Sequence, residues 1–209
     1  MTYAKIENGA VAQYPVYPGD IRLAFPHISF PAGAFDPPEG YVLVADAGQP
    51  QPALDQDVIE GEPVELNGTW SRNWQIVTVA PEVAAERLAA RRAQVRAAIN
   101  AKHHIVENGT AHTPLGAVNC DLESRNKING AVLMALLANT AGQPFSIAWT
   151  MADDTEMLHD ADDMIAMGQA VGVYVATCHA VARAKKDMAA TATTPAELEA
   201  IDLDAGWPA

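Results

Sequence analysis

The sequence has few of the features that mark secreted, disulfide-stabilised or membrane-spanning proteins. It contains two cysteines, Cys120 and Cys178, far apart and without C-x-x-C spacing, so we expect reduced, buried thiols rather than a disulfide framework. No uninterrupted apolar run reaches about eighteen residues, and we therefore expect no membrane-spanning segment. The first twenty residues lack a basic stretch followed by an apolar one, which predicts synthesis without a secretory signal.

Basic residues are also scarce. The 209 residues include 13 Lys and Arg against 26 Asp and Glu, for a formal net charge of −13. Such a chain gains nothing from releasing counterions on a phosphate backbone, and an anionic membrane surface would repel it. We therefore expect neither a nucleic-acid nor a membrane partner, and we interpret the acidity as an aid to solubility or a match to a basic protein surface.

Common catalytic motifs are missing as well. The sequence has no G-x-S-x-G, G-x-x-x-x-G-K-[ST], H-E-x-x-H or G-x-G-x-x-G pattern, and these are the patterns that carry nucleophilic, phosphate-binding and metal chemistry. His103 and His104 lie at a predicted helix end, where they suit the helix dipole. Cys178 and His179 are neighbours on a predicted helix and point about 100° apart, so they form no dyad. We expect no catalytic residue, metal ligand or cofactor.

One acidic segment allows three interpretations. Between residues 153 and 163 it holds five aspartates, one glutamate and His159. Asp153 and Asp154 fall at a predicted turn, and Asp160 precedes a predicted helix, so capping explains the carboxylates best. A metal site or a catalytic site is the alternative, with His159 and Asp163 as two potential ligands. Two ligands do not complete a site, and the calcium-loop pattern is absent.

The first 80 residues predict a small antiparallel β module. Asn8-Gly9 and Asn67-Gly68 each lie between alternating runs, which is typical of a tight hairpin turn. Four prolines between residues 26 and 38 predict a loop. The module is expected to span residues 1–80 as short strands and turns.

Pro81 begins a different pattern. Residues 81–104 are Ala-rich, with acidic residues first and basic residues later, the charge order that the helix dipole favours. Hairpins and helices then alternate to the end: Asp121 and Asp160 are predicted helix N-caps, Thr194 caps a short helix, and residues 203–209 are expected to be loose. The predicted class is therefore α+β, with a second module over residues 81–209.

Motifs in this second module are similar to a known family. They are Thr113-Pro114-Leu115-Gly116, the helix start at Asp121–Ser124, the stretch Ile128–Ala131, and Trp149 followed by Asp153-Asp154. Over residues 83–195 the chain resembles the C-terminal domain of unknown function that recurs in tail proteins of tailed bacteriophages. The front of the chain resembles tail fibre assembly proteins through an opening Y-x-x-I-x-x-G strand, a P-x-G-Y step and a G-x-W-x-x-x-W strand.

The resemblance implies a non-enzymatic tail-associated structural protein, at the baseplate or tail tip or linking tail fibres to the tail. It would be made in the host cytoplasm, form a homo-oligomer and contact other tail or fibre proteins. The alternative is a fibre assembly chaperone that is absent from the mature virion; a metal-dependent hydrolase has only the acidic segment to support it. The interface residues that we predict are Tyr14, Tyr17, Phe25, Phe30, Arg87 and Arg91, with exposed apolar patches around Trp70, Trp74 and Phe30.

Overall fold

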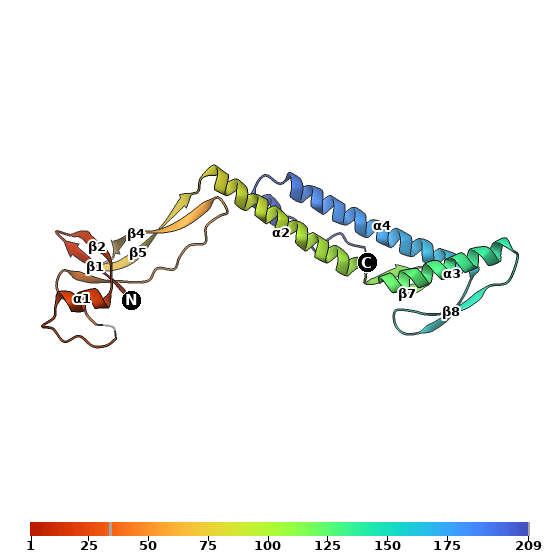
Figure 1. Cartoon of the computed structure of the whole chain (residues 1–209), viewed down its shortest axis with the longest axis horizontal. Helices are drawn as coiled ribbons and strands as arrows, with labels where there is room; N and C mark the ends of the chain where they lie inside the picture. Colours follow the sequence, from red (N-terminus) through yellow and green to blue (C-terminus); the bar gives the residue numbers. More distant parts are fainter. Residues whose placement is uncertain (34, 209) are drawn as a thin grey trace. The chain divides into compact units, whose positions relative to one another are not determined.

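The computed structural model describes residues 1–33 and 35–208, and it confirms the α+β class (Figure 1). The chain forms two compact units, Met1–Arg87 and Leu88–Ala209. Their boundary falls inside helix α2 (Pro81–Glu107), whose first residue was the boundary expected from the sequence. Each unit has its own apolar core, and each is described separately.

The N-terminal unit contains a three-stranded sheet and a long hairpin. The sheet has the order β2-β1-β3, all antiparallel, and β4 pairs with β5. The strands are β1 (Thr2–Glu7), β2 (Ala10–Val16), β3 (Tyr41–Val44), β4 (Gln56–Leu66) and β5 (Thr69–Thr78). Both predicted Asn-Gly turns are confirmed: Asn8 and Asn67 have positive φ, as do the glycines after them, which is the requirement of a type I′ turn.

The sequence analysis missed one helix in this unit. Helix α1 (Pro18–Ala24) begins with proline and is followed by the predicted loop. It buries a single residue, Ile21, which packs with Tyr3 and Val16 in the core of the unit. The helix is too short to show an apolar period, and its Pro-Gly-Asp start is equally typical of a turn.

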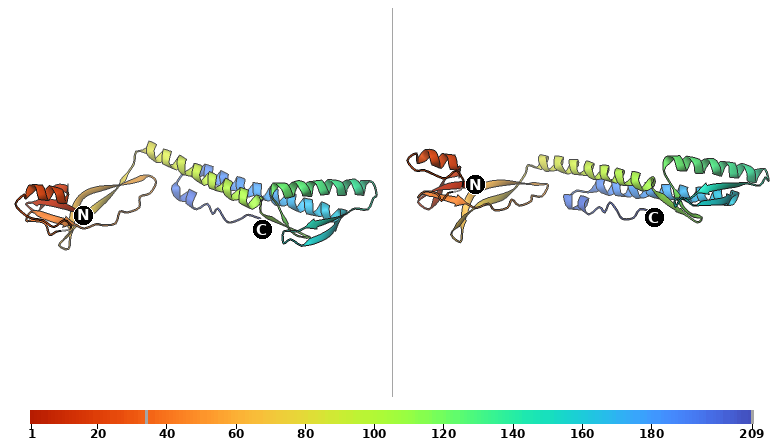
Figure 2. Two further views of the ribbon diagram at one scale, coloured as in Figure 1. Left: turned by 60° about the horizontal axis from the view of Figure 1, so that its bottom comes forward. Right: turned by 90° about the horizontal axis from the view of Figure 1, so that it is seen from below.

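The C-terminal unit alternates helices with two-stranded hairpins. After α2 come β6 (Thr110–Thr113), β7 (Gly116–Asn119), α3 (Leu122–Thr140), β8 (Ser146–Thr150), β9 (Glu156–Asp160), α4 (Ala161–Thr191) and α5 (Pro195–Glu199). In this unit α4, in blue, runs beside both α2 and α3 (Figures 1 and 2). The helix starts were predicted correctly: Asp121, Asp160 and Thr194 each accept a backbone N–H as N-cap.

Helix α2 ends later than the sequence analysis placed it. The helical pattern was predicted to end at residue 104, with a hairpin following, whereas residues 105–107 form the last turn of the helix. The Asn108 side chain donates to the carbonyl of His104 at 2.8 Å, and Gly109 follows. Tyr174 of α4 also donates its hydroxyl to the carbonyl of Val106 at 2.6 Å. This tertiary contact extends the helix beyond the point that the local sequence indicated.

Two apolar clusters hold the C-terminal unit together, and α4 contributes to both. The first includes Ile128 of α3 with Met164, Met167 and Cys178 of α4. The second joins Val95 and Ile99 of α2 to Ala182, Ala189, Leu198 and Ile201. The expectation of a loose C-terminus was wrong for residues 203–208: Trp207 packs against the second cluster, and Lys102 Nζ lies 2.6 Å from Asp204 Oδ1.

Helix α4 is also long and apolar enough to cross a membrane by length and composition, with a mean hydropathy of 1.4 over its most apolar window. The core helix of a water-soluble unit meets the same criteria. One face of α4 is buried among other residues of the unit, including Met164, Met167 and Tyr174.

Helices α3 and α4 approach closely at one glycine. A Cβ placed on Gly168 would lie 2.6 Å from Val132 Cγ2 of α3, closer than two carbons can come. Gly172, one turn later on the same helix, has no heavy atom within 4 Å of such a Cβ. The two glycines therefore have different roles: Gly168 allows the helix contact, and Gly172 faces open space.

We predict that Gly168→Ala lowers the free energy of unfolding by about 1–3 kcal/mol, because the added methyl forces the packed helices apart. Gly172→Ala is the matched control and should be neutral or stabilising by up to about 1 kcal/mol, because alanine favours a helix. Urea denaturation followed by circular dichroism measures both. Equal effects at the two positions would contradict the packing that we describe.

A second prediction concerns the thiols, which are fully buried. Burial raises the pKa of Cys120 and of Cys178, so both remain protonated and inaccessible in the folded chain. An aromatic disulfide reagent at pH 8 should therefore react slowly with native protein and with two thiols per chain after denaturation. Rapid reaction of either thiol in native protein would show that the core opens locally.

Candidate functional site

The acidic segment of residues 153–163 has the capping role that the sequence favoured. Asp153 Oδ1 accepts from the Thr155 amide at 3.1 Å and from its hydroxyl at 2.6 Å, and the hydroxyl bond lowers the pKa of Asp153. Asp154 takes a positive φ of 64° in the turn. Asp160 Oδ1 accepts from the Asp163 amide at 2.9 Å. Asp153 and Asp160 thus satisfy backbone and hydroxyl donors of their own turn and helix start, and Asp154 supplies the left-handed residue of the turn.

The predicted pair of ligands in this segment gathers no third donor. His159 is buried, and its Nδ1 lies 3.6 Å from Asp163 Oδ2. Throughout residues 1–33 and 35–208, the structure brings three potential metal-binding side chains together at one place only, and His159 is not among them. The acidic segment therefore gives no support to the hydrolase alternative.

The aromatic residues predicted at an interface divide into two kinds. Phe25 and Phe30 are partly buried against the core of the N-terminal unit. The Tyr14 hydroxyl donates to Glu60 of the neighbouring hairpin, whereas Tyr17 is 55% exposed. Tyr17 is thus the most available of the four for a partner.

The two arginines predicted at an interface also differ. Arg87 Nη2 lies 2.9 Å from Asp57 Oδ1, so this side chain ties the start of α2 to β4. Arg91 contacts Gln94, one turn along the same helix, at 3.3 Å. Trp70 and Trp74 are partly buried rather than prominent, and Trp74 Nε1 donates to the carbonyl of Ala47 at 2.6 Å.

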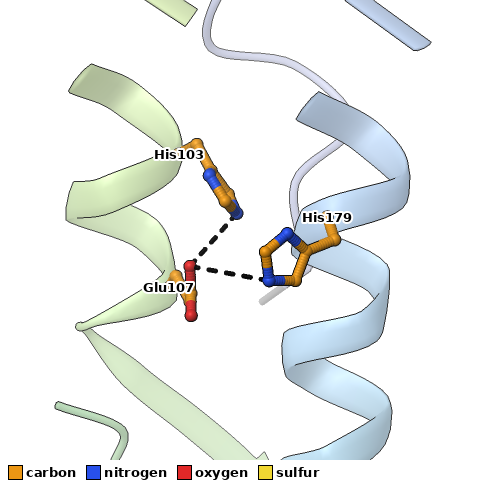
Figure 3. Close-up of side chains that lie close together, drawn as sticks. All are labelled: His103, Glu107 and His179. Carbon is orange, nitrogen blue, oxygen red and sulfur yellow. Dashed lines mark ion pairs between the residues drawn. The ribbon is translucent and has the colours of Figure 1, made fainter. Parts of the chain in front are cut away.

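The cluster of three donors lies between α2 and α4 and consists of His103, Glu107 and His179 (Figure 3). His103 and Glu107 are one turn apart on α2, and His179 faces them from α4. Glu107 Oε2 lies 3.2 Å from His103 Nε2 and 4.0 Å from His179 Nε2. The three donor atoms all lie within 4.8 Å of one another. We call this group the His-Glu-His cluster.

Neighbouring side chains orient the cluster. Arg125 of α3 donates to Glu107 Oε1, which leaves Oε2 facing the two imidazoles. The indole of Trp207 stacks on His103 with ring centres 6.1 Å apart and planes inclined by 17°. Glu107 is therefore held by Arg125 of α3 and faces His179 of α4. His103 is covered by Trp207 of the C-terminal segment.

Burial favours the neutral form of the inner histidine. It lowers the pKa of His103, and this effect exceeds the opposing attraction of Glu107. His103 Nε2 has no accessible surface and no hydrogen-bond partner, because its short contact with Glu107 does not have hydrogen-bond direction. A buried nitrogen without a partner is uncommon and calls for an explanation. A neutral imidazole beside a carboxylate could bind a metal ion or exchange a proton.

Sequence reasoning missed this cluster for two reasons. It ended α2 at His104, so the one-turn spacing of His103 and Glu107 was not visible. It also considered His179 only with its chain neighbour Cys178. The signal that could have found the pair on α2 is H-x-x-x-E within a continuous helix, which places both side chains on one face.

A second feature is a set of exposed apolar side chains on α3 and on the β8–β9 hairpin. Large apolar side chains on them are exposed by 44–74%: Leu122, Leu133, Met134, Leu136, Leu137, Met157 and Leu158. The whole chain exposes 12723 Å². Two separate globular units of these masses would expose about 11,000 Å². The chain therefore exposes more surface than two such units would, and large apolar side chains contribute to it.

Comparison with curated proteins and with solved structures found no match. A family model described as a domain of unknown function, DUF4376, matches residues 90–204, which is more than half of the chain. The match contains the His-Glu-His cluster, both hairpins of the C-terminal unit and the exposed face of α3. The chain is a member of the DUF4376 family.

Proposed function

We propose that the protein is a non-enzymatic structural component of a bacteriophage tail, at the baseplate or tail tip or between the tail and its fibres. The observation that carries the proposal is the uncovered apolar surface of α3 and β8–β9. The resemblance of the motifs to those of phage tail proteins is the reason for proposing a phage tail as the assembly. A subunit of a symmetric assembly needs such surfaces, because its neighbours cover them.

Helix α3 shows why a neighbour is needed. Its buried residues Ile128, Ala131 and Ala135 pack against α4, yet Leu133 and Leu137 on another side are 58% and 62% exposed. A helix that is apolar on more than one face is expected to be buried on more than one face. The occupant we propose is a second copy of the chain or an adjoining tail protein.

The N-terminal unit offers a different kind of contact. Its long β4–β5 hairpin is two-stranded and carries Ile59, Leu66 and Ile76 with about half of each side chain exposed. Apart from a single bridge between Ala45 and Ser71, the hairpin pairs with no other strand among the described residues, so its edges are open to pairing or packing. With exposed Tyr17, this unit would bind a fibre or another tail protein.

A chaperone for fibre assembly is the second candidate. The observation that favours it is the net charge of −13, since an acidic surface helps keep an aggregation-prone client soluble. A chaperone leaves its client, whereas a structural component stays in the particle. The two candidates therefore differ in whether mature virions contain the chain.

We predict that quantitative mass spectrometry of purified virions finds the chain in a fixed copy number, a multiple of three or six, because tail organelles are built from rotationally symmetric rings. A tail protein of known copy number in the same sample calibrates the count. If the chain is absent from virions but bound to a fibre protein in lysate, the chaperone replaces the structural component. Absence from both would contradict both candidates.

We also predict that the α3 face mediates self-association. The double variant Leu133→Gln and Leu137→Gln should shift the purified protein toward monomer in analytical ultracentrifugation, because it removes apolar area from the contact. Its unfolding free energy should change by no more than about 0.5 kcal/mol, as for other surface substitutions. Leu23→Gln, at an 81% exposed position of α1, is the control. It should leave the mass of the sedimenting species the same as that of the wild type. A wild-type protein that stays monomeric at high concentration would contradict self-association through α3.

A further inference from the structure

We propose that the His-Glu-His cluster binds one divalent transition-metal ion, with Zn²⁺ the best match, and that this ion joins α2 to α4. The ligands would be Nε2 of His103, Nε2 of His179 and Oε2 of Glu107. This site is independent of the proposed tail function, because it rests on the geometry of the C-terminal unit alone.

The donor set fits the chemistry of zinc. Two imidazoles and one carboxylate form a common three-ligand zinc set, with a fourth position left for water. Calcium and magnesium prefer all-oxygen sites, and two nitrogen donors disfavour both ions. The cluster therefore selects a borderline transition metal over the hard cations.

The spacing needs little adjustment. Ligand atoms of tetrahedral zinc lie about 3.4 Å apart when each bond is about 2.1 Å long. Glu107 Oε2 is already 3.2 Å from His103 Nε2 and 4.0 Å from His179 Nε2. The His179 side chain is 62% exposed, so it is free to rotate toward the other two donors.

The surroundings hold the ligands in a position ready for metal. Arg125 occupies the far oxygen of Glu107, which is the kind of outer contact that orients a ligating carboxylate. Tyr174 fixes the last turn of α2 against α4 through Val106. The buried Nε2 of His103 makes no hydrogen bond although Glu107 Oε2 lies 3.2 Å away, and a metal ion between the two atoms would satisfy both.

The site is open on one side and closed on the other. His103 and Glu107 are largely buried, at 14% and 16% side-chain exposure, while His179 lies at the surface. An ion can therefore enter past His179, and water can complete its coordination. Once bound, it would link α2 to α4 beside the segment that carries Trp207.

The test uses the full chain without an affinity tag, treated with chelator and then dialysed. Isothermal titration with Zn²⁺ should show one ion per chain, and Co²⁺ should produce visible absorption bands of a nitrogen- and oxygen-liganded site. His179→Ala should weaken Zn²⁺ binding at least tenfold and abolish the Co²⁺ bands. Because His179 is exposed, this variant should fold, and its circular dichroism spectrum should match the wild type.

His104→Ala is the matched control. His104 is adjacent to His103 on α2 but contacts Asn108 instead of the cluster. It should bind Zn²⁺ as tightly as the wild type. The proposal is overturned if the wild type does not bind Zn²⁺ at millimolar concentration, if His179→Ala binds as the wild type does, or if His104→Ala loses as much affinity as His179→Ala. Millimolar Mg²⁺ that displaced the bound Zn²⁺ would overturn the choice of metal.

Discussion

The packing of α4 against the other helices of the C-terminal unit and against strands β6 and β9 is the interaction on which this unit depends. One face of the helix supplies Met164, Met167 and Cys178 to the cluster shared with α3 and the hairpins. Its later turns supply Ala182 and Ala189 to the cluster shared with α2 and α5. Small residues let the neighbouring helices approach, most closely at Gly168, where a side chain would strike Val132. Helix α2 also reaches both clusters, with Val106 against the first and with Val95 and Ile99 in the second, but α4 contributes more buried residues to the two clusters together.

The His-Glu-His cluster follows from this arrangement. The Tyr174 hydroxyl donates a hydrogen bond to the carbonyl of Val106 in the last turn of α2. This contact keeps the next residue, Glu107, in the helix. Burial raises the pKa of Tyr174 to about 12, so the hydroxyl remains a hydrogen-bond donor at neutral pH. Arg125 of α3 contacts Glu107 from one side. His179 of α4 approaches the same carboxylate from the other helix. Three helices thus determine the position of one carboxylate, and two of them bring its imidazole neighbours.

Packing around α4 leaves other apolar side chains of the C-terminal unit exposed. The C-terminal unit uses the apolar residues of α4 for its core, but nothing among residues 88–208 covers the outer residues of α3 and of β8–β9. Metal binding and association with neighbours are separate consequences. The first would stabilise the unit internally, at the junction of α2 and α4. The second would use the exposed side of α3, which does not contribute to the cluster.

Local chemistry determined much of this protein from the sequence alone. Asn-Gly pairs placed two hairpin turns, and Asp121, Asp160 and Thr194 placed three helix starts, because each acts through its own backbone neighbours. The capping roles of Asp153 and Asp160 in the acidic segment were predicted for the same reason. Tertiary structure decided where α2 ends, that Trp207 is packed, and that His103 meets His179 from a distant helix. Those outcomes depend on contacts between residues far apart in the chain, and no spacing within a single segment encodes them.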